Sequence, residues 1–295
     1  MKIKLLYLVL FVLVFVIAAC GNELHSDLQK YKRDMKPIYK KENSILKDID
    51  KLKLNQLDQL IGTEVTAEKH KALNDLQSKL EKQIIPEVND LKKQADNMDI
   101  STNEVKDAHQ IYMNNIQKKE QTIKELNEYI SLFKQSINSN EKILKYTNTF
   151  EKNKSDAEKN AKLAKNSNED KADYDALTAV IDKNSDELNN KAKYLNDTQN
   201  VQDKADYIQN EIIPLFKKNV KSLNQTNISS NRVNQMRQSQ IEMYYTLINY
   251  YKERKKGIII EDKLQNIQLP NGVNGQFTYL GKDDKYNRAI ERLEK

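Results

Sequence analysis

The chain of 295 residues has very few of the residues that build metal centres, disulfide frameworks or sugar-stacking clefts. It contains one cysteine, no tryptophan, three histidines, six glycines and four prolines. A single cysteine excludes disulfides within the chain. The histidines, His25, His70 and His109, stand far apart, and no metal-ligand spacing, phosphate-binding glycine loop or nucleophile elbow occurs in the sequence. We therefore predict a protein that is not an enzyme and that uses no cofactor or metal.

The N-terminus carries a long apolar run. Lys2 and Lys4 precede an uninterrupted apolar stretch of 15 residues, 5–19. A membrane-spanning helix needs about 20 such residues, so the pattern predicts a signal peptide over residues 1–19. The run ends in Ile-Ala-Ala-Cys followed by glycine. This ending resembles the lipobox of bacterial lipoproteins, although leucine is usual where Ile17 stands.

The lipobox resemblance implies that Cys20 receives a diacylglyceryl group and becomes the first residue of the mature protein. Two acyl chains, at about 0.8 kcal/mol per buried methylene, would hold the protein at the membrane. The alternative is an ordinary secreted protein with an unmodified thiol. We expect a lipid-anchored protein on the outer face of the cytoplasmic membrane of a Gram-positive bacterium.

Lysine supplies most of the positive charge. The formal net charge is +6, or +4 without Lys2 and Lys4. Dispersed lysines favour loose attraction to an anionic surface, whereas bidentate recognition needs arginine. The anionic partners in the envelope are teichoic acids, lipid head groups and peptidoglycan carboxylates, but a solvated surface without a ligand is the simpler explanation. Nucleic acid is not expected as a partner, because the chain is exported and carries no nucleic-acid motif.

Apolar residues recur with steps of four and three over most of the chain. This spacing predicts long helices packed along a seam. In the first of three such runs, Glu42 fills one of the apolar positions. The three runs are Leu24, Leu28, Tyr31, Met35, Ile38, Ile45, Ile49 and Leu52; Leu73, Leu76, Leu80, Ile84, Val88, Leu91, Ala95 and Met98; and Val105, Ala108, Tyr112, Ile123, Leu126, Ile130, Phe133 and Ile137. We predict an all-α protein of elongated, tandem three-helix bundles, spectrin-like in outline.

A short internal repeat supports the tandem arrangement. Two pairs of stretches match in one ungapped register, 128 residues apart: 84–86 with 212–214, and 100–105 with 228–233. The match suggests that a helix–turn–helix unit is duplicated. Pro86 and Pro214 should kink their helices. Ser101 and Ser229 stand where the following helices need N-caps.

Composition sets the expected boundaries. Residues 151–172 have few bulky apolar side chains and many charges of both signs, which suits a linker or an exposed connecting helix; we predict the helix. It would join a first helical unit, residues 20–150, to a second, residues 173–256. Residues 257–295 are expected to form a small tail of extended pieces around an Asn-Gly turn, with a short helix over 284–294.

The stretch QIEMYYTLINYYKERKKG, residues 240–257, combines two tyrosine pairs with a basic cluster. On a helix, Tyr244 falls on a wide apolar face, so we predict that it packs in the core. Glu242 points away from that face and has no lysine or arginine three or four positions along the helix. We expect Glu242 to meet a neighbouring element, of which the tail is the nearest.

The basic cluster consists of Lys252, Arg254, Lys255 and Lys256, just before Gly257. Two interpretations remain open. Basic residues in a last helical turn followed by glycine are expected from the helix dipole and from C-capping. The same residues are candidates for binding an anionic polymer.

The tetrapeptide Glu242-Met243-Tyr244-Tyr245, late in an exported helical chain with a lipobox, resembles the motif of the EMYY-motif lipoproteins of Gram-positive cocci. The likeness covers essentially the whole chain. The chain also resembles, more loosely, the YkyA-type cell-wall-binding lipoproteins, which implies a wall-associated role. Neither family supplies catalytic residues to carry over.

These patterns together predict a non-enzymatic envelope lipoprotein. We expect it to bind the cell wall, through teichoic acid or peptidoglycan. The alternative is a scaffold or assembly partner for another envelope protein. A solute-binding lipoprotein would need alternating strands and helices around a cleft, which the heptads disfavour.

Overall fold

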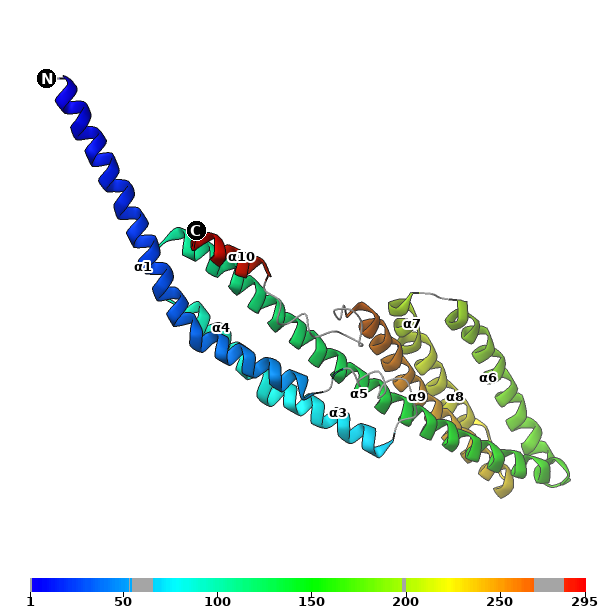
Figure 1. Cartoon of the computed structure of the whole chain (residues 1–295). Coiled ribbons are helices and arrows are strands. Elements are labelled where there is room, and N and C mark those ends of the chain that lie inside the picture. The colour runs from blue at the N-terminus through cyan, green and yellow to red at the C-terminus, as the bar shows by residue number, and fades with distance from the viewer. Residues whose placement is uncertain (1, 53, 55–65, 198–199, 268–283) are drawn as a thin grey trace. The chain divides into compact units, whose positions relative to one another are not determined.

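The computed structural model describes the backbone of residues 2–52, 54, 66–197, 200–267 and 284–295, and side chains from residue 23 onward. The regular structure of these residues is helical throughout, which confirms the all-α prediction (Figure 1). The chain divides into two compact units. Unit 1 comprises residues 1–131 and 268–295, and unit 2 comprises residues 132–267.

Unit 1 is built from three helical rods and a short C-terminal helix. Its elements are α1 (Lys2–Asp50), the rod α3 (Ala67–Lys79), η2 (Leu80–Ile84) and α4 (Ile85–Asp96), the first part of α5 (Asn103–Lys165), and α10 (Asp284–Leu293). The heptad residues between Leu28 and Ile130 line its core, with Tyr31, Met35, Leu73 and Tyr112 almost completely buried. The seam that the spacing predicts is therefore present.

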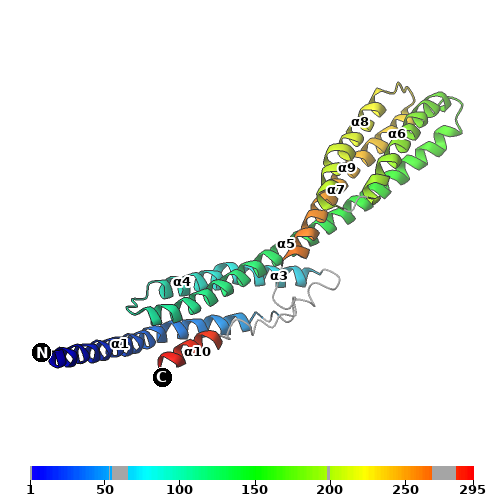
Figure 2. The same ribbon diagram turned by 90° about the horizontal axis from the view of Figure 1, so that it is seen from above.

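Unit 2 has four helical rods where the sequence predicted three. They are the remainder of α5, α6 (Lys171–Asp197), the rod α7 (Val201–Tyr207), η3 (Ile208–Ile212) and α8 (Ile213–Gln225), and α9 (Asn231–Asn266) (Figure 2). The exposed helix predicted over 151–172 is present over residues 151–165, where most side chains are exposed. It continues α5 within unit 2 and packs there through Asn153, Ala157 and Ala164, so it does not join two units.

The repeat is visible in the backbone as a π-helical turn before each proline. η2 and η3 stand 128 residues apart, and in each the next amide donates five residues back, from Ile85 to Leu80 and from Ile213 to Ile208. A proline ring clashes with the carbonyl four residues earlier, and that carbonyl lies within the widened turn in both copies. We infer that the π turn makes room for the ring, so that each rod continues through its proline.

An aspartate holds the turn before the last helix of each repeat. The Asp27 carboxylate accepts hydrogen bonds from the Thr102 amide (2.8 Å) and hydroxyl (2.7 Å), and Asp173 accepts from the Ser229 and Ser230 amides (2.7 and 2.6 Å). Burial raises the pKa of Asp27, but the bonds from Thr102 and Ser101 outweigh it and lower the pKa overall.

The predicted serine N-caps lie one residue too early. Helix α9 is capped by Ser230, whose hydroxyl accepts from the Val233 amide, and α5 begins at Asn103. Ser229 instead uses its amide and its hydroxyl to bind Asp173. A partner from another helix therefore changed the role of the serine, which the local sequence alone could not indicate.

Helix α9 does not end before Gly257, contrary to the prediction. It runs on to Asn266, so residues 257–266 are helical and not extended. A glycine within a helix costs about 1 kcal/mol relative to alanine. Ile258, which packs against the unit 2 core, and Ile260, which is buried, offset that cost. The expected Asn-Gly turn falls in residues 268–283, outside the described part of the chain.

The short C-terminal helix predicted near residue 284 is confirmed as α10, and it docks on unit 1. Tyr286 is 2% exposed, and its hydroxyl lies 3.0 Å from that of Tyr31 and also bonds that of Tyr39. The Tyr31 hydroxyl in turn lies 3.1 Å from Nδ1 of His109. This chain of hydroxyl groups and an imidazole fixes α10 beside α1 and α5 (Figure 1).

Candidate binding site on unit 2

The predicted signal peptide and lipidation site lie at residues for which no side chain is described. The apolar stretch and Cys20 both fall before residue 23, where the structure gives the helical backbone of α1. Over the residues with described side chains, the helices are too short or too polar to span a membrane. Lipidation of Cys20 therefore remains a prediction from the sequence.

The tetrapeptide at 242–245 is divided between core and surface. Met243 and Tyr244 are buried at 8% and 3% exposure, while Glu242 and Tyr245 face solvent. The Tyr244 ring lies 6.0 Å from that of Phe216, and burial raises its pKa. Tyr244 thus packs in the core, as predicted. Among the described residues Glu242 has no ion pair, and the tail segment 268–283 lies outside them.

The four basic residues before Gly257 do not form one surface. Lys252 is exposed, Lys255 donates to Gln209 (3.1 Å), and Lys256 pairs with Glu253 (2.9 Å). Arg254, two positions from Lys252 and Lys256, points to another side of the helix and lines a groove. Because α9 continues for ten more residues, these residues do not lie in its last turn, and the capping explanation is wrong.

Lys256 has a structural role. It neutralises Glu253, a carboxylate only 7% exposed, which also accepts a hydrogen bond from the Ser139 hydroxyl (3.0 Å). Burial raises the pKa of Glu253, but Lys256, Ser139 and Lys142 outweigh it and lower the pKa overall. This site joins α9 to α5 within unit 2. Lys256 is therefore not free to bind a polymer.

An open groove of about 670 Å³ lies between the end of α6, helix α7 and the C-terminal half of α9. Aliphatic side chains and the rings of Tyr250 and Tyr251 form part of its wall. Those two rings meet edge to face at 5.3 Å between centroids. The lining residues are Leu195, Asn196, Val201, Lys204, Ile208, Tyr250, Tyr251, Arg254, Ile258, Glu261, Asp262 and Gln265.

Four charged side chains line this groove without pairing. Lys204, Arg254, Glu261 and Asp262 form no ion pair with any described residue, although both signs are present. Burial raises the pKa of Tyr251, and the nearby Arg254 opposes that shift. Only Arg254 was predicted as a candidate, because the helix was expected to end before Gly257, which placed Glu261 and Asp262 in the tail, and because Lys204 lies on another helix.

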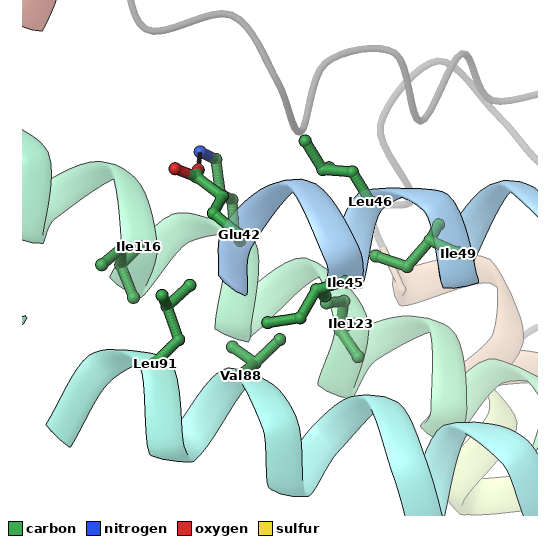
Figure 3. Close-up of a pocket in the computed structure, with 9 residues that line it drawn as sticks. Glu42, Ile45, Leu46, Ile49, Val88, Leu91, Ile116 and Ile123 are labelled. Carbon is green, nitrogen blue, oxygen red and sulfur yellow. Dashed lines mark hydrogen bonds and ion pairs between the residues drawn. The ribbon is translucent and has the colours of Figure 1, made fainter. Parts of the chain in front are cut away.

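Unit 1 has an open hollow of about 580 Å³ along α1, lined by Lys36, Tyr39, Lys40, Asn43, Ser44 and Lys47. Between α1, α4 and α5 it also holds a small cavity of about 20 Å³ (Figure 3). This is room for about one water molecule. Its wall is aliphatic except at the rim, where Glu42 fills the polar slot of the heptad run. Glu42 pairs with Lys119 and accepts a hydrogen bond from the Tyr112 hydroxyl (3.0 Å). The carboxylate is therefore satisfied within the core, and the cavity is too small for a ligand.

The described residues contain no group of three or more His, Cys, Asp or Glu side chains placed to hold a metal ion. Fold and site together define an all-helical protein of two repeated units, the second of which carries an open groove lined by charges of both signs. The chain belongs to the family of EMYY-motif containing lipoproteins, whose model matches residues 1–294. It is accordingly a surface lipoprotein, as the motif suggested. No curated protein and no solved structure matches the chain.

Proposed function

We propose that this lipoprotein is a non-enzymatic binding protein that attaches cell-wall material to the membrane surface through the unit 2 groove. The observation that carries the proposal is the set of unpaired charges in the groove. Four charged side chains of both signs face one concave, partly aromatic surface, and two of them, Lys204 and Asp262, are only partly exposed; this arrangement favours an external ligand. The lipid on Cys20 would supply the anchor.

The family motif fits this proposal because its buried residues anchor α9 in the core of unit 2. Met243 and Tyr244 hold the helix in the core, and α9 then supplies Tyr250, Tyr251, Arg254, Ile258, Glu261, Asp262 and Gln265 to the groove. A helix is rigid over such a distance. Packing at the motif therefore sets the angle at which these side chains face a ligand.

The scaffold alternative is favoured by a different surface. Tyr245 is 53% exposed, and the unpaired Glu242 lies three residues before it on the same face of α9. Exposed tyrosines are frequent in protein interfaces. A protein partner would be seated on this face and not in the groove, so the two functions predict effects at different residues.

The test uses full-length protein in detergent, sedimented with purified cell walls. We expect sedimentation to fall at least tenfold in Arg254→Gln with Lys204→Gln, and to stay unchanged in the control Lys252→Gln with Lys255→Gln, which removes the same charge outside the groove. Tyr245→Ala should also leave it unchanged. Equal losses in both double variants would show dispersed charge attraction. No sedimentation at all would refute wall binding and favour the scaffold.

A further inference from the structure

Several residues of the unit 2 groove occupy repeat positions at which unit 1 has buried hydrophobic residues. The two π turns fix the repeat register at 128 residues, so residues of α7 and α9 have direct equivalents in α3 and α5. Lys204 corresponds to Leu76 and Arg254 to Leu126, two leucines that are 8% and 1% exposed. Glu261, Asp262 and Gln265 correspond to Phe133, Lys134 and Ile137, which lie beyond the end of unit 1 and carry no comparison with its core. The apolar positions Val201, Ile208 and Ile258 correspond to the buried Leu73, Leu80 and Ile130.

Lys204 and Arg254 therefore break the pattern that folds the other copy. A fully buried leucine stabilises a helical bundle, and unit 2 forgoes this at Lys204 and Arg254. Local departures from the folding pattern without a structural gain are typical of functional sites. Lys256, by contrast, has a structural partner in Glu253. The four charged groove residues have no ion-pair partner among the described residues, so their charges point to a ligand.

The signs of these charges limit the class of ligand. Arg254 and Lys204 suit a carboxylate, and Glu261 and Asp262, about two turns further along α9 than Arg254, suit an ammonium group. A uniformly anionic polymer would be repelled by the two carboxylates. The Tyr250 and Tyr251 rings and the aliphatic wall suit an apolar backbone between the charges.

We propose that the groove binds a short zwitterionic peptide with a free carboxylate and a free ammonium group. The proposal rests on the proposed wall binding and names its ligand: the peptide part of peptidoglycan, which carries both charges, and not its glycan or a phosphate polymer. The carboxylate lies against Arg254 and Lys204, and the ammonium against Glu261 and Asp262.

The experiment measures fluorescence anisotropy of full-length protein in detergent with four labelled lysine-containing pentapeptides. One has a free C-terminus and a free lysine amine; the others have an amidated C-terminus, an acetylated lysine, or both. We expect each modification to weaken binding by roughly tenfold or more, as loss of a charge-assisted hydrogen bond predicts.

Protein variants assign each charge to its partner. Arg254→Gln should remove the difference between the free and amidated C-termini and leave the effect of lysine acetylation. Glu261→Gln with Asp262→Asn should do the reverse. Lys252→Gln, on the same helix but outside the groove, should bind all four peptides as the wild type does.

Three results would overturn the inference. One is equal binding of all four peptides. Another is that Arg254→Gln, or Glu261→Gln with Asp262→Asn, weakens the binding of all four peptides by the same factor. The third is failure of the wild type to bind the free peptide. If wall sedimentation nevertheless depends on Arg254 and Lys204, the ligand is another wall component and the proposed function stands. If sedimentation is also absent, both proposals fail.

Discussion

The two units share an order of elements but use the inside of their bundles differently. Unit 1 fills its seam with heptad side chains, pairs Glu42 with Lys119, and docks α10 through Tyr286. Unit 2 keeps a packed centre around Phe216 and Tyr244 but opens towards the end of α9, where charged residues replace leucine. The same repeated arrangement of helices therefore forms a packed seam in unit 1 and leaves an open groove in unit 2.

This difference shows where polar groups inside a bundle indicate function. Several buried polar groups of unit 1 bond one another, as in the series His109, Tyr31, Tyr286 and Tyr39. Such networks specify packing. The charged groups of the unit 2 groove lack partners among the described residues. The presence of a polar residue at a core position is therefore less informative than whether it has a partner.

The largest expected effect comes from removing the ring that docks α10. Tyr286→Ala should cost about 3–5 kcal/mol, the usual loss for a buried aromatic side chain. Hydrogen exchange should show loss of protection over 284–293, with unit 2 unaffected. Tyr245→Ala, at an exposed tyrosine of unit 2, should change stability by less than about 0.5 kcal/mol. Full protection of 284–293 in Tyr286→Ala would contradict this account.

An intermediate effect is expected from giving unit 2 the residues of unit 1. Lys204→Leu with Arg254→Leu should raise the free energy of unfolding of unit 2 by about 1–2 kcal/mol, since each leucine is partly buried in the groove. It should also abolish wall binding, a trade of activity for stability. Urea denaturation followed by hydrogen exchange measures the first effect. Lys252→Leu is the control, and a less stable double variant would refute the repeat equivalence.

The smallest expected effect is a pH dependence confined to unit 1, which contains all three histidines. Burial lowers the pKa of His109 below its ordinary value of 6.5, opposed by a hydrogen bond to the Ala95 carbonyl and by Asp96. The unfolded chain therefore takes up a proton before the folded one. Stability of unit 1 should fall as the pH drops from 6.5 towards the lower folded pKa.

The measurement is hydrogen exchange of both units at pH 7.5 and 5.5, corrected for the intrinsic pH dependence of exchange. His109→Gln should remove the dependence, whereas His25→Gln, at an exposed position, should retain it. Equal pH dependence in the two units would show that His109 is not its source.

Much of the fold followed from periodicity and from the repeat. The spacing of four and three predicted the buried seam from Leu28 to Ile130, and the two Ile-Ile-Pro stretches marked the rods that contain the π turns. Composition misled at two places. The charged residues 151–165 belong to unit 2 and do not connect two units, and Gly257 lies within α9, where Ile258 packs against the core and Ile260 is buried.

The sequence by itself determined the class of helix packing, the family motif and the burial of Tyr244, because these depend on residues a few positions apart on one helix. Only the tertiary structure decided that Glu253 accepts a hydrogen bond from Ser139, that Tyr286 reaches Tyr31, and that Lys204 and Arg254 face one groove. These contacts join residues distant in the chain. Whether a charge is satisfied depends on which helix lies opposite, and local spacing carries no information about that.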